Sequence, residues 1–406
     1  MNPNQDLGKG GGRGYLVGGV ALVYFIAALE IVIMISPFAF FFYSVFNPIL
    51  LGLNRWSGTR WLTAFFLPHM IVPPTPFLVG LRVLGSVLFI AGTLIFLICA
   101  AQVYLGKLLK WGVASRGFYA VMRHPQYTGL AMAGTGLAVL WPRFLTLMFL
   151  AVMMFLYYLL AKDEERRMLR RYGEPYQAYL ERTGMFFPRL SGRRAAARPL
   201  RLRNAAILLV LLAGGAAAVG FGLRAYTVAH LPLETIDGVD VVSILPDDVP
   251  LADSLLQSAE RDPLVAQRLR SIQTTQGSRT LAYIVPVNYI MQGMIANTGP
   301  EWMLFQRHQT LAMISDYIIN PIGHLQGGHI SHMSPMTHDS PAMKRRIIFI
   351  GVRGNQPLQS AAADFRINDT RVARFFVDIH LHTNEVLQVQ DTPGGTGWGD
   401  VPTPMF

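Results

Sequence analysis

Side chains that could bind a small molecule carrying charges of both signs are concentrated in two short stretches. The first stretch is Gly117-Phe-Tyr-Ala-Val-Met-Arg-His-Pro-Gln-Tyr-Thr-Gly129, and the second is the pair Glu164-Glu165. Arg123 presents a planar fork of donors that suits a carboxylate. A glutamate suits an ammonium group or ribose hydroxyls. Taken alone, each stretch is more typical of a basic loop at a membrane boundary or of a solvated helix.

A helical hairpin is expected to bring the two stretches together. Apolar runs at about 127–141 and 144–161 are separated only by Pro142-Arg143. A joint this short predicts two antiparallel helices. The end of the second helix, residues 162–165, then returns to the face of the membrane that carries Arg123.

The order of these features resembles the isoprenylcysteine carboxyl methyltransferase family and its phospholipid N-methyltransferase relatives, over about residues 78–190. The shared pattern is a Gly-x-Tyr-x3-Arg-His-Pro-x-Tyr-x-Gly run, a hairpin, the Glu-Glu pair and a tyrosine-rich tail with Tyr172, Tyr176 and Tyr179. The resemblance implies S-adenosylmethionine as the cofactor. It also implies an acceptor that is lipid-like, prenylated or otherwise anchored in the membrane.

The same resemblance assigns site residues in this sequence. The expected cofactor-binding residues are Tyr119, Arg123, His124, Pro125, Tyr127, Gly129, Glu164 and Glu165. Arg123, His124 and Glu165 are the expected catalytic residues. Methyl transfer is a direct displacement, which depends on holding the reacting atoms about 3–3.5 Å apart more than on an acid or a base.

The first half of the chain has the composition of a membrane protein. A helix needs about 20 apolar residues to cross a bilayer, and about five candidate spans are present. They are residues 15–35, 78–105, 127–141, 144–161 and 205–223, while the proline-rich residues 37–78 suggest a re-entrant or interfacial segment. Residues 1–235 carry 23 Lys and Arg against 8 Asp and Glu, and the basic loops fall on one side of these spans. Basic loops remain cytoplasmic, which predicts a cytoplasmic N-terminus and gives little support to nucleic-acid binding.

The sequence thus predicts a polytopic α-helical membrane domain followed by an extramembrane α+β domain. The expected divisions are 1–203 for the methyltransferase-like domain, 204–223 for the last transmembrane helix and 224–406 for an extracytoplasmic domain. In a bacterial inner membrane this last domain is periplasmic. A helix is expected at 250–272 and strands at 280–287, 346–352 and 374–382, the last with His380 and His382 on one face.

Metal binding is a weaker expectation. The single cysteine, Cys99, excludes an intrachain disulfide and any multi-cysteine metal site. Histidine and methionine together suit copper, and copper candidates gather in one loop of the C-terminal part. They are His329, His332, Met333, Met336 and His338. A loop that only packs against a partner explains the same residues.

Two hypotheses of different class remain. The first is a membrane-embedded S-adenosylmethionine-dependent methyltransferase. The second is a catalytically inactive, methyltransferase-like assembly subunit of a larger membrane complex, which docks on a protein partner through its extracytoplasmic domain. Loss of methylation in Arg123 and Glu165 variants that stay folded would distinguish the enzyme from the subunit.

Overall fold

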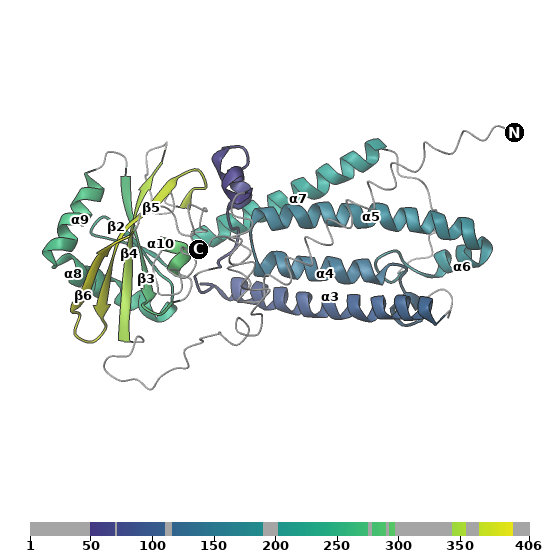
Figure 1. The fold of residues 1–406 in the computed structure, drawn as a ribbon, viewed down its shortest axis with the longest axis horizontal. Coiled ribbons are helices and arrows are strands. Elements are labelled where there is room, and N and C mark those ends of the chain that lie inside the picture. The colour runs from purple at the N-terminus through teal and green to yellow at the C-terminus, as the bar shows by residue number, and fades with distance from the viewer. Residues whose placement is uncertain are drawn as a thin grey trace, which may run out of the picture. The chain divides into compact units, whose positions relative to one another are not determined.

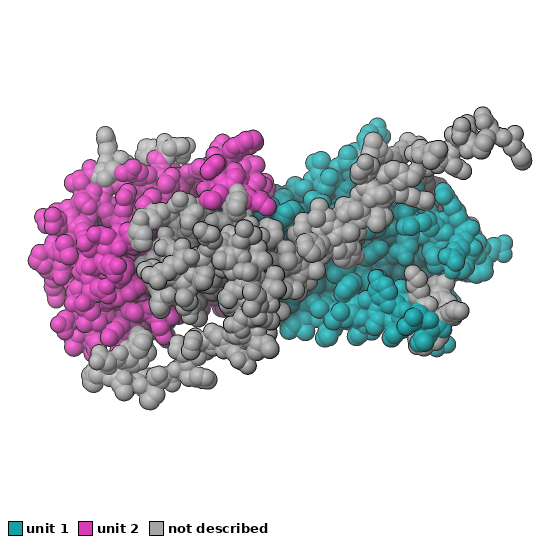
Figure 2. All heavy atoms as spheres, in the orientation of Figure 1, with its two compact units in different colours: residues 1–32, 80–220 teal, residues 33–79, 221–406 magenta. Residues whose placement is uncertain are grey.

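A computed structural model describes the chain in eight stretches (Figure 1). These are residues 49–69, 71–109, 116–189, 202–274, 278–289, 292–296, 343–354 and 365–392. The chain divides into two compact units (Figure 2). Unit 1 comprises Met1–Val32 and Gly80–Gly220, and unit 2 comprises Ile33–Val79 and Phe221–Phe406.

Three described helices are long and apolar enough to cross a membrane: α3 (Pro76–Leu108), α5 (Phe144–Tyr172) and α7 (Leu202–Ala229). At most 33% of the apolar stretch of each is buried within the protein. So much exposed apolar surface needs lipid around it, which indicates an integral membrane protein.

The expected number of about five spans is only partly matched. The candidate at 15–35 lies outside the described residues. The run at 127–141 does form a helix, α4 (Pro125–Leu140), but it has 16 residues. At 1.5 Å per residue that is about 24 Å, which is less than the roughly 30 Å of a hydrocarbon core. Three spans are therefore supported in the described chain.

The expected hairpin is formed by α4 and α5. Only Trp141, Pro142 and Arg143 separate the two helices. They pack through Ala138 of α4 and through Leu150, Met153 and Tyr157 of α5. The shared apolar face explains why α5 returns along α4.

Glycines bring α4 against α3. Gly85 and Gly92 of α3 face Gly129 and Gly136 of α4, with the same seven-residue spacing on both helices. A Cβ added at Gly129 would lie 2.8 Å from the Gly92 carbonyl oxygen and 2.8 Å from the Phe96 amide nitrogen. Small residues of this kind let two membrane helices approach backbone to backbone.

Unit 2 contains a six-stranded sheet in the order β1-β2-β3-β4-β5-β6 (Figure 1). The strands are β1 (Leu233–Ile236), β2 (Val239–Ser243), β3 (Ser278–Pro286), β4 (Lys344–Arg353), β5 (Thr370–His380) and β6 (Val386–Asp391). Only β2 and β3 are parallel, and the other pairs are antiparallel. The parallel pair is joined by a crossover that includes η3 (Pro246–Leu251), α8 (Ala252–Glu260) and α9 (Pro263–Gln273).

The expected helix at 250–272 is two helices. α8 ends at Glu260, and Asp262 caps α9 by accepting hydrogen bonds from the amides of Leu264 and Val265. Pro263 follows at the first position of the new helix, where its missing amide proton costs nothing. Leu255 and Leu269, one from each helix, share a core with Phe349 and Phe375 of the sheet.

The three expected strands are present as β3, β4 and β5, and three more were not predicted. One correction concerns the histidines: β5 ends at His380, and His382 lies in the following turn. The amide of His382 instead lies 3.3 Å from His380 Nδ1. His380 and His382 therefore do not share one face of a strand.

Residues 49–79 belong to unit 2 rather than to the helices of unit 1. They include helical residues 49–55 and the short helix η1 (Arg60–Thr63). The Val72 amide donates to the Ile244 carbonyl at 3.2 Å, and Arg60 Nη1 donates to the Asn368 carbonyl at 3.0 Å. These bonds tie the proline-rich segment, which suggested a re-entrant or interfacial element, to the unit that holds the sheet.

Candidate active site

The arginine-histidine-proline loop of unit 1 begins at a glycine that the backbone requires. Gly117 has φ +60°, a conformation that side chains with a Cβ rarely adopt, and it opens the short helix η2 (Gly117–Ala120). Gln102 of α3 holds the entry to the loop by donating to the Arg116 carbonyl at 3.1 Å. Tyr119 lies within η2 and is buried.

The chain after α6 (Glu174–Arg182) pairs with this loop. The Arg123 amide donates to the Gly184 carbonyl at 2.8 Å, and the His124 amide donates to the Met185 carbonyl at 3.1 Å. In return, the Gly184 amide donates to the Val121 carbonyl at 3.2 Å. This short parallel ladder fixes the backbone that carries Arg123 and His124.

A tyrosine of α6 strengthens the same junction. The Tyr179 hydroxyl donates to the Tyr119 carbonyl at 2.6 Å, with both residues buried. Burial raises the pKa of the Tyr119 and Tyr179 hydroxyls, so both remain protonated near neutral pH. The Tyr179 hydrogen bond therefore fixes α6 against η2.

Arg123 and Glu165 form a buried ion pair. Arg123 Nε lies 2.6 Å from Glu165 Oε1, and the side chains are only 6% and 3% exposed. Arg123 Nη1 donates to the Leu180 carbonyl at 3.1 Å and also to the Thr183 carbonyl. The guanidinium thus joins α5, α6 and the loop, and much of its donor capacity is already used within the protein.

Glu164 differs sharply from its neighbour. Its side chain is 49% exposed, and its Oε2 lies 3.5 Å from both His124 Nδ1 and the Tyr127 hydroxyl. His124 Nε2 lies 3.5 Å from Glu165 Oε1, so this buried imidazole lies between the two carboxylates. With a neutral imidazole, the cluster of one guanidinium and two carboxylates carries a net negative charge.

The carboxylates control the protonation of His124. Burial by itself lowers the pKa of the imidazole, but the contacts with Glu164 and Glu165 outweigh it and raise the pKa above its usual range near 6.5. Protonation of His124 cancels the negative charge of the cluster.

Stacked rings extend from His124 into the hairpin. The rings of His124 and Tyr127 are 5.5 Å apart and nearly parallel, and those of Tyr127 and Tyr157 are 5.2 Å apart with an angle of 3°. Sequence reasoning missed Tyr157. Its position seven residues before Glu164, on the same face of one helix, was the available signal.

The remaining predicted residues have positional roles. Pro125 opens α4 in its first turn, and it is buried. Gly129 lies on α4 where that helix meets the α3 backbone. The structure thus gathers Arg123, His124, Tyr127, Glu164 and Glu165 in one cluster, with Tyr119 joined to it through Tyr179.

Comparison with known proteins assigns part of the chain to a family. Residues 76–175 match the phospholipid methyltransferase family (PEMT). This broader family includes the isoprenylcysteine carboxyl methyltransferases. A domain of this family implies S-adenosylmethionine-dependent methyl transfer. Comparison with curated proteins and with solved structures gives no match.

The chemistry of the cluster fits S-adenosylmethionine. The cofactor carries an ammonium and a sulfonium group, and the cluster offers a half-exposed carboxylate at Glu164 together with net negative charge. The partly buried ring of Tyr127, beside Glu164, suits a cation or a flat ring. The residues present can therefore hold this group.

The structure does not describe the residues predicted as copper ligands. His329, His332, Met333, Met336 and His338 lie outside the described residues. Within the part of the chain that the structure covers, no group of three His, Cys, Asp or Glu side chains could hold a metal ion.

Proposed function

We propose that this protein is a membrane-embedded S-adenosylmethionine-dependent methyltransferase whose acceptor is lipid-soluble or anchored in the membrane. The observation that carries the proposal is the meeting of Arg123-His124 with Glu164-Glu165, which are about 40 residues apart in the chain. The match of residues 76–175 to the phospholipid methyltransferase family supports it independently.

The two glutamates have different roles in this proposal. Glu165 is buried against Arg123 and holds the loop and the tail in place. Glu164 presents its carboxylate beside His124 and Tyr127, where it would bind the ammonium or the ribose hydroxyls of the cofactor. Arg123 positions the loop, because the described residues already occupy both its Nε and its Nη1.

The cofactor supplies a methyl group on a sulfonium, ready for direct displacement by a nucleophile. The contribution of the protein is to hold the two reactants in line, about 3–3.5 Å apart. A net negative cluster favours a cationic cofactor. No residue has to form a covalent bond.

The acceptor would enter from the bilayer. α3 and α5 expose large apolar side chains along their length, among them Leu94, Ile98 and Phe149. A lipid-like molecule can reach these surfaces without leaving the hydrocarbon, while a polar cofactor arrives from the aqueous side. Prenylated proteins, phospholipids and small isoprenoids all satisfy this description.

Calorimetry with the detergent-purified full-length protein tests the proposal. We expect wild-type protein to bind S-adenosylmethionine and Glu164→Gln to bind it at least tenfold more weakly. Glu174→Gln provides a matched control, because Glu174 is an exposed glutamate in the first turn of α6. Its affinity should stay within about twofold of wild type.

The result also decides between the enzyme and the assembly subunit. If folded protein that is confirmed free of bound cofactor gives no binding heat, the enzyme hypothesis is rejected. That result would favour a methyltransferase-like subunit that docks through residues 224–406.

A further inference from the structure

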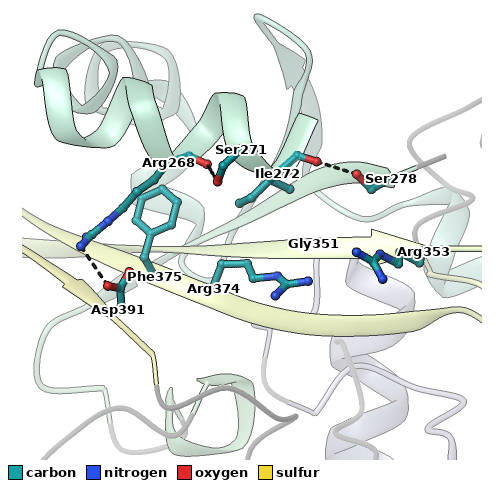
Figure 3. A pocket seen from close by; sticks show the side chains of 9 residues that line it. All are labelled: Arg268, Ser271, Ile272, Ser278, Gly351, Arg353, Arg374, Phe375 and Asp391. Atoms are coloured by element: carbon teal, nitrogen blue, oxygen red, sulfur yellow. Dashed lines mark hydrogen bonds and ion pairs between the residues drawn. The ribbon is translucent and has the colours of Figure 1, made fainter. Parts of the chain in front are cut away.

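Unit 2 contains a cavity of about 290 Å³ between α9 and the sheet (Figure 3). Its lining comes from α9, β3, β4, β5 and the end of β6. The size is close to the lower end of the roughly 300–1,000 Å³ that ligand pockets occupy. The site cluster of unit 1 contributes no residue to it.

An irregularity in β5 directs two consecutive side chains into this cavity. Phe349 of β4 pairs with Phe375, but the next residue, Ile350, pairs with Ala373. Arg374 is therefore an extra residue in β5, a β-bulge. In a regular strand Arg374 and Phe375 would face opposite sides, whereas here both line the cavity.

Three arginines and one carboxylate line the same space. The guanidinium carbon (Cζ) of Arg268, on α9, lies over the Phe375 ring, 5.7 Å from its centroid. Its Nη2 lies 3.0 Å from Asp391 Oδ2 (Figure 3). The buried Nη1 of Arg268 has no hydrogen-bond partner among the described residues. Within that same part of the chain, Arg353 and Arg374 have no carboxylate partner. The lining thus carries two positive charges in excess.

A glycine keeps the floor of the cavity open. Gly351 lies in β4, two residues before its end, and is absent from the described residues with positive φ. A Cβ added there would meet Arg374 Nε at 3.4 Å and Ile272 Cγ2 at 3.6 Å, both close to ordinary contact. Neither the backbone conformation nor the packing therefore requires a glycine at position 351. The missing side chain leaves empty space beside Arg374.

We propose that this cavity binds the phosphate group of a phosphate-bearing ligand. Guanidinium groups match phosphate oxygens with paired hydrogen bonds. A phosphate monoester carries about −1.5 to −2 charges at neutral pH, which balances the excess of the lining. Phe375 and Ile272 provide an apolar wall for the carbon atoms next to the phosphate. The ligand is either a soluble phosphoester or the headgroup of a phospholipid.

Titration of the full-length protein in detergent tests the site. The probes are inorganic phosphate, glycerol 3-phosphate and dihexanoyl phosphatidate below its micelle concentration, at constant ionic strength in chloride. Arg353→Gln and Arg374→Gln should each weaken phosphate binding at least tenfold, and Gly351→Leu should abolish it by filling the floor. Arg270→Gln is the matched control, because Arg270 is an exposed arginine of α9 outside the cavity.

Each outcome has a defined meaning. Tighter binding of phosphatidate than of glycerol 3-phosphate supports a lipid headgroup, and the reverse supports a soluble phosphoester. No binding to folded wild-type protein overturns the proposal. If Arg270→Gln weakens phosphate binding as much as the cavity variants do, the proposal is also overturned. Phosphate binding would then depend on the overall positive charge of the protein and not on this cavity. Circular dichroism of Gly351→Leu shows whether its loss of binding comes from the filled cavity, and the two arginine variants decide the question if that protein is unfolded.

Discussion

Two neighbouring glutamates of α5 illustrate how position alone separates structural from chemical roles. Consecutive residues on a helix point about 100° apart. Glu165 therefore turns inward to Arg123, while Glu164 remains half exposed next to His124 and Tyr127. A buried ion pair that loses one partner leaves the other charge without compensation, whereas a half-exposed carboxylate is still solvated.

The stability of variants should reveal this difference. Glu165→Gln is expected to destabilise the protein by about 3–5 kcal/mol, because it leaves the buried Arg123 guanidinium without its counter-charge. Glu164→Gln should change stability by less than about 1 kcal/mol. Thermal unfolding in detergent measures both. Equal destabilisation by the two variants would contradict the assignment of distinct roles.

The pH dependence of the site follows from His124. A pKa raised in the folded protein means that the contacts of the imidazolium stabilise the fold below about pH 6.5. This contribution is lost as pH rises through the higher pKa of the folded state. Binding of a cationic cofactor should change in the opposite direction, because a protonated His124 competes for Glu164 and Glu165.

We therefore expect the affinity for S-adenosylmethionine to rise as pH increases from 6 to 8. His124→Gln should remove most of this dependence, whatever its effect on affinity at a single pH. Calorimetry of both proteins across that range is the measurement. A pH profile that is the same in His124→Gln would show that another group is responsible.

At the scale of elements, the contact between α3 and α4 depends on glycines. Gly92 packs directly against the backbone of α4 at Gly129 and Ala133. Because α4 begins at Pro125, directly after His124, the position of this helix also sets the position of the site loop.

A bulky residue at this contact should separate the helices. Gly92→Ile is expected to destabilise the membrane unit by about 1–3 kcal/mol, as overpacking does elsewhere, and to weaken cofactor binding. Gly80→Ile, on the same helix with open space around its Cα, should do neither. Thermal unfolding and cofactor titration of the two variants check this, and an equal effect at Gly80 would show that helix propensity is the cause.

At the scale of the whole molecule, each unit has its own contacts, and the orientation in the membrane stays a prediction. Phe77 at the start of α3 packs against Tyr226 near the end of α7, and both belong to unit 2. The basic loops of the sequence predict that the site loop of unit 1 is cytoplasmic and that unit 2 is extracytoplasmic.

Cysteine labelling tests this topology. In a Cys99→Ser background, which removes the single native cysteine, Ser254→Cys on the exposed surface of α8 should react with an impermeant maleimide in intact cells or spheroplasts. Arg170→Cys on α5 should react only after the membrane is permeabilised. The reverse pattern would invert the predicted orientation.

The sequence by itself determined the features that depend on neighbouring residues. Apolar runs marked the long helices, and short runs rich in Ile, Val, Phe and Tyr marked β3, β4 and β5. The order of Arg123-His124-Pro125 and Glu164-Glu165 predicted the candidate site residues. The β1–β2 hairpin could also have been predicted, because the sequence Asp237-Gly238 is a strong signal for a tight turn. Both residues have positive φ in the structure.

Only the tertiary structure decided which of these residues meet. Nothing in the sequence indicated that Arg123 would use its donors on Glu165 and on the carbonyls of Leu180 and Thr183. Nor did it place residues 49–79 with the sheet, or put both Arg374 and Phe375 in the lining of one cavity. Such contacts join distant parts of the chain and are set by how whole elements pack, for which no local periodicity exists.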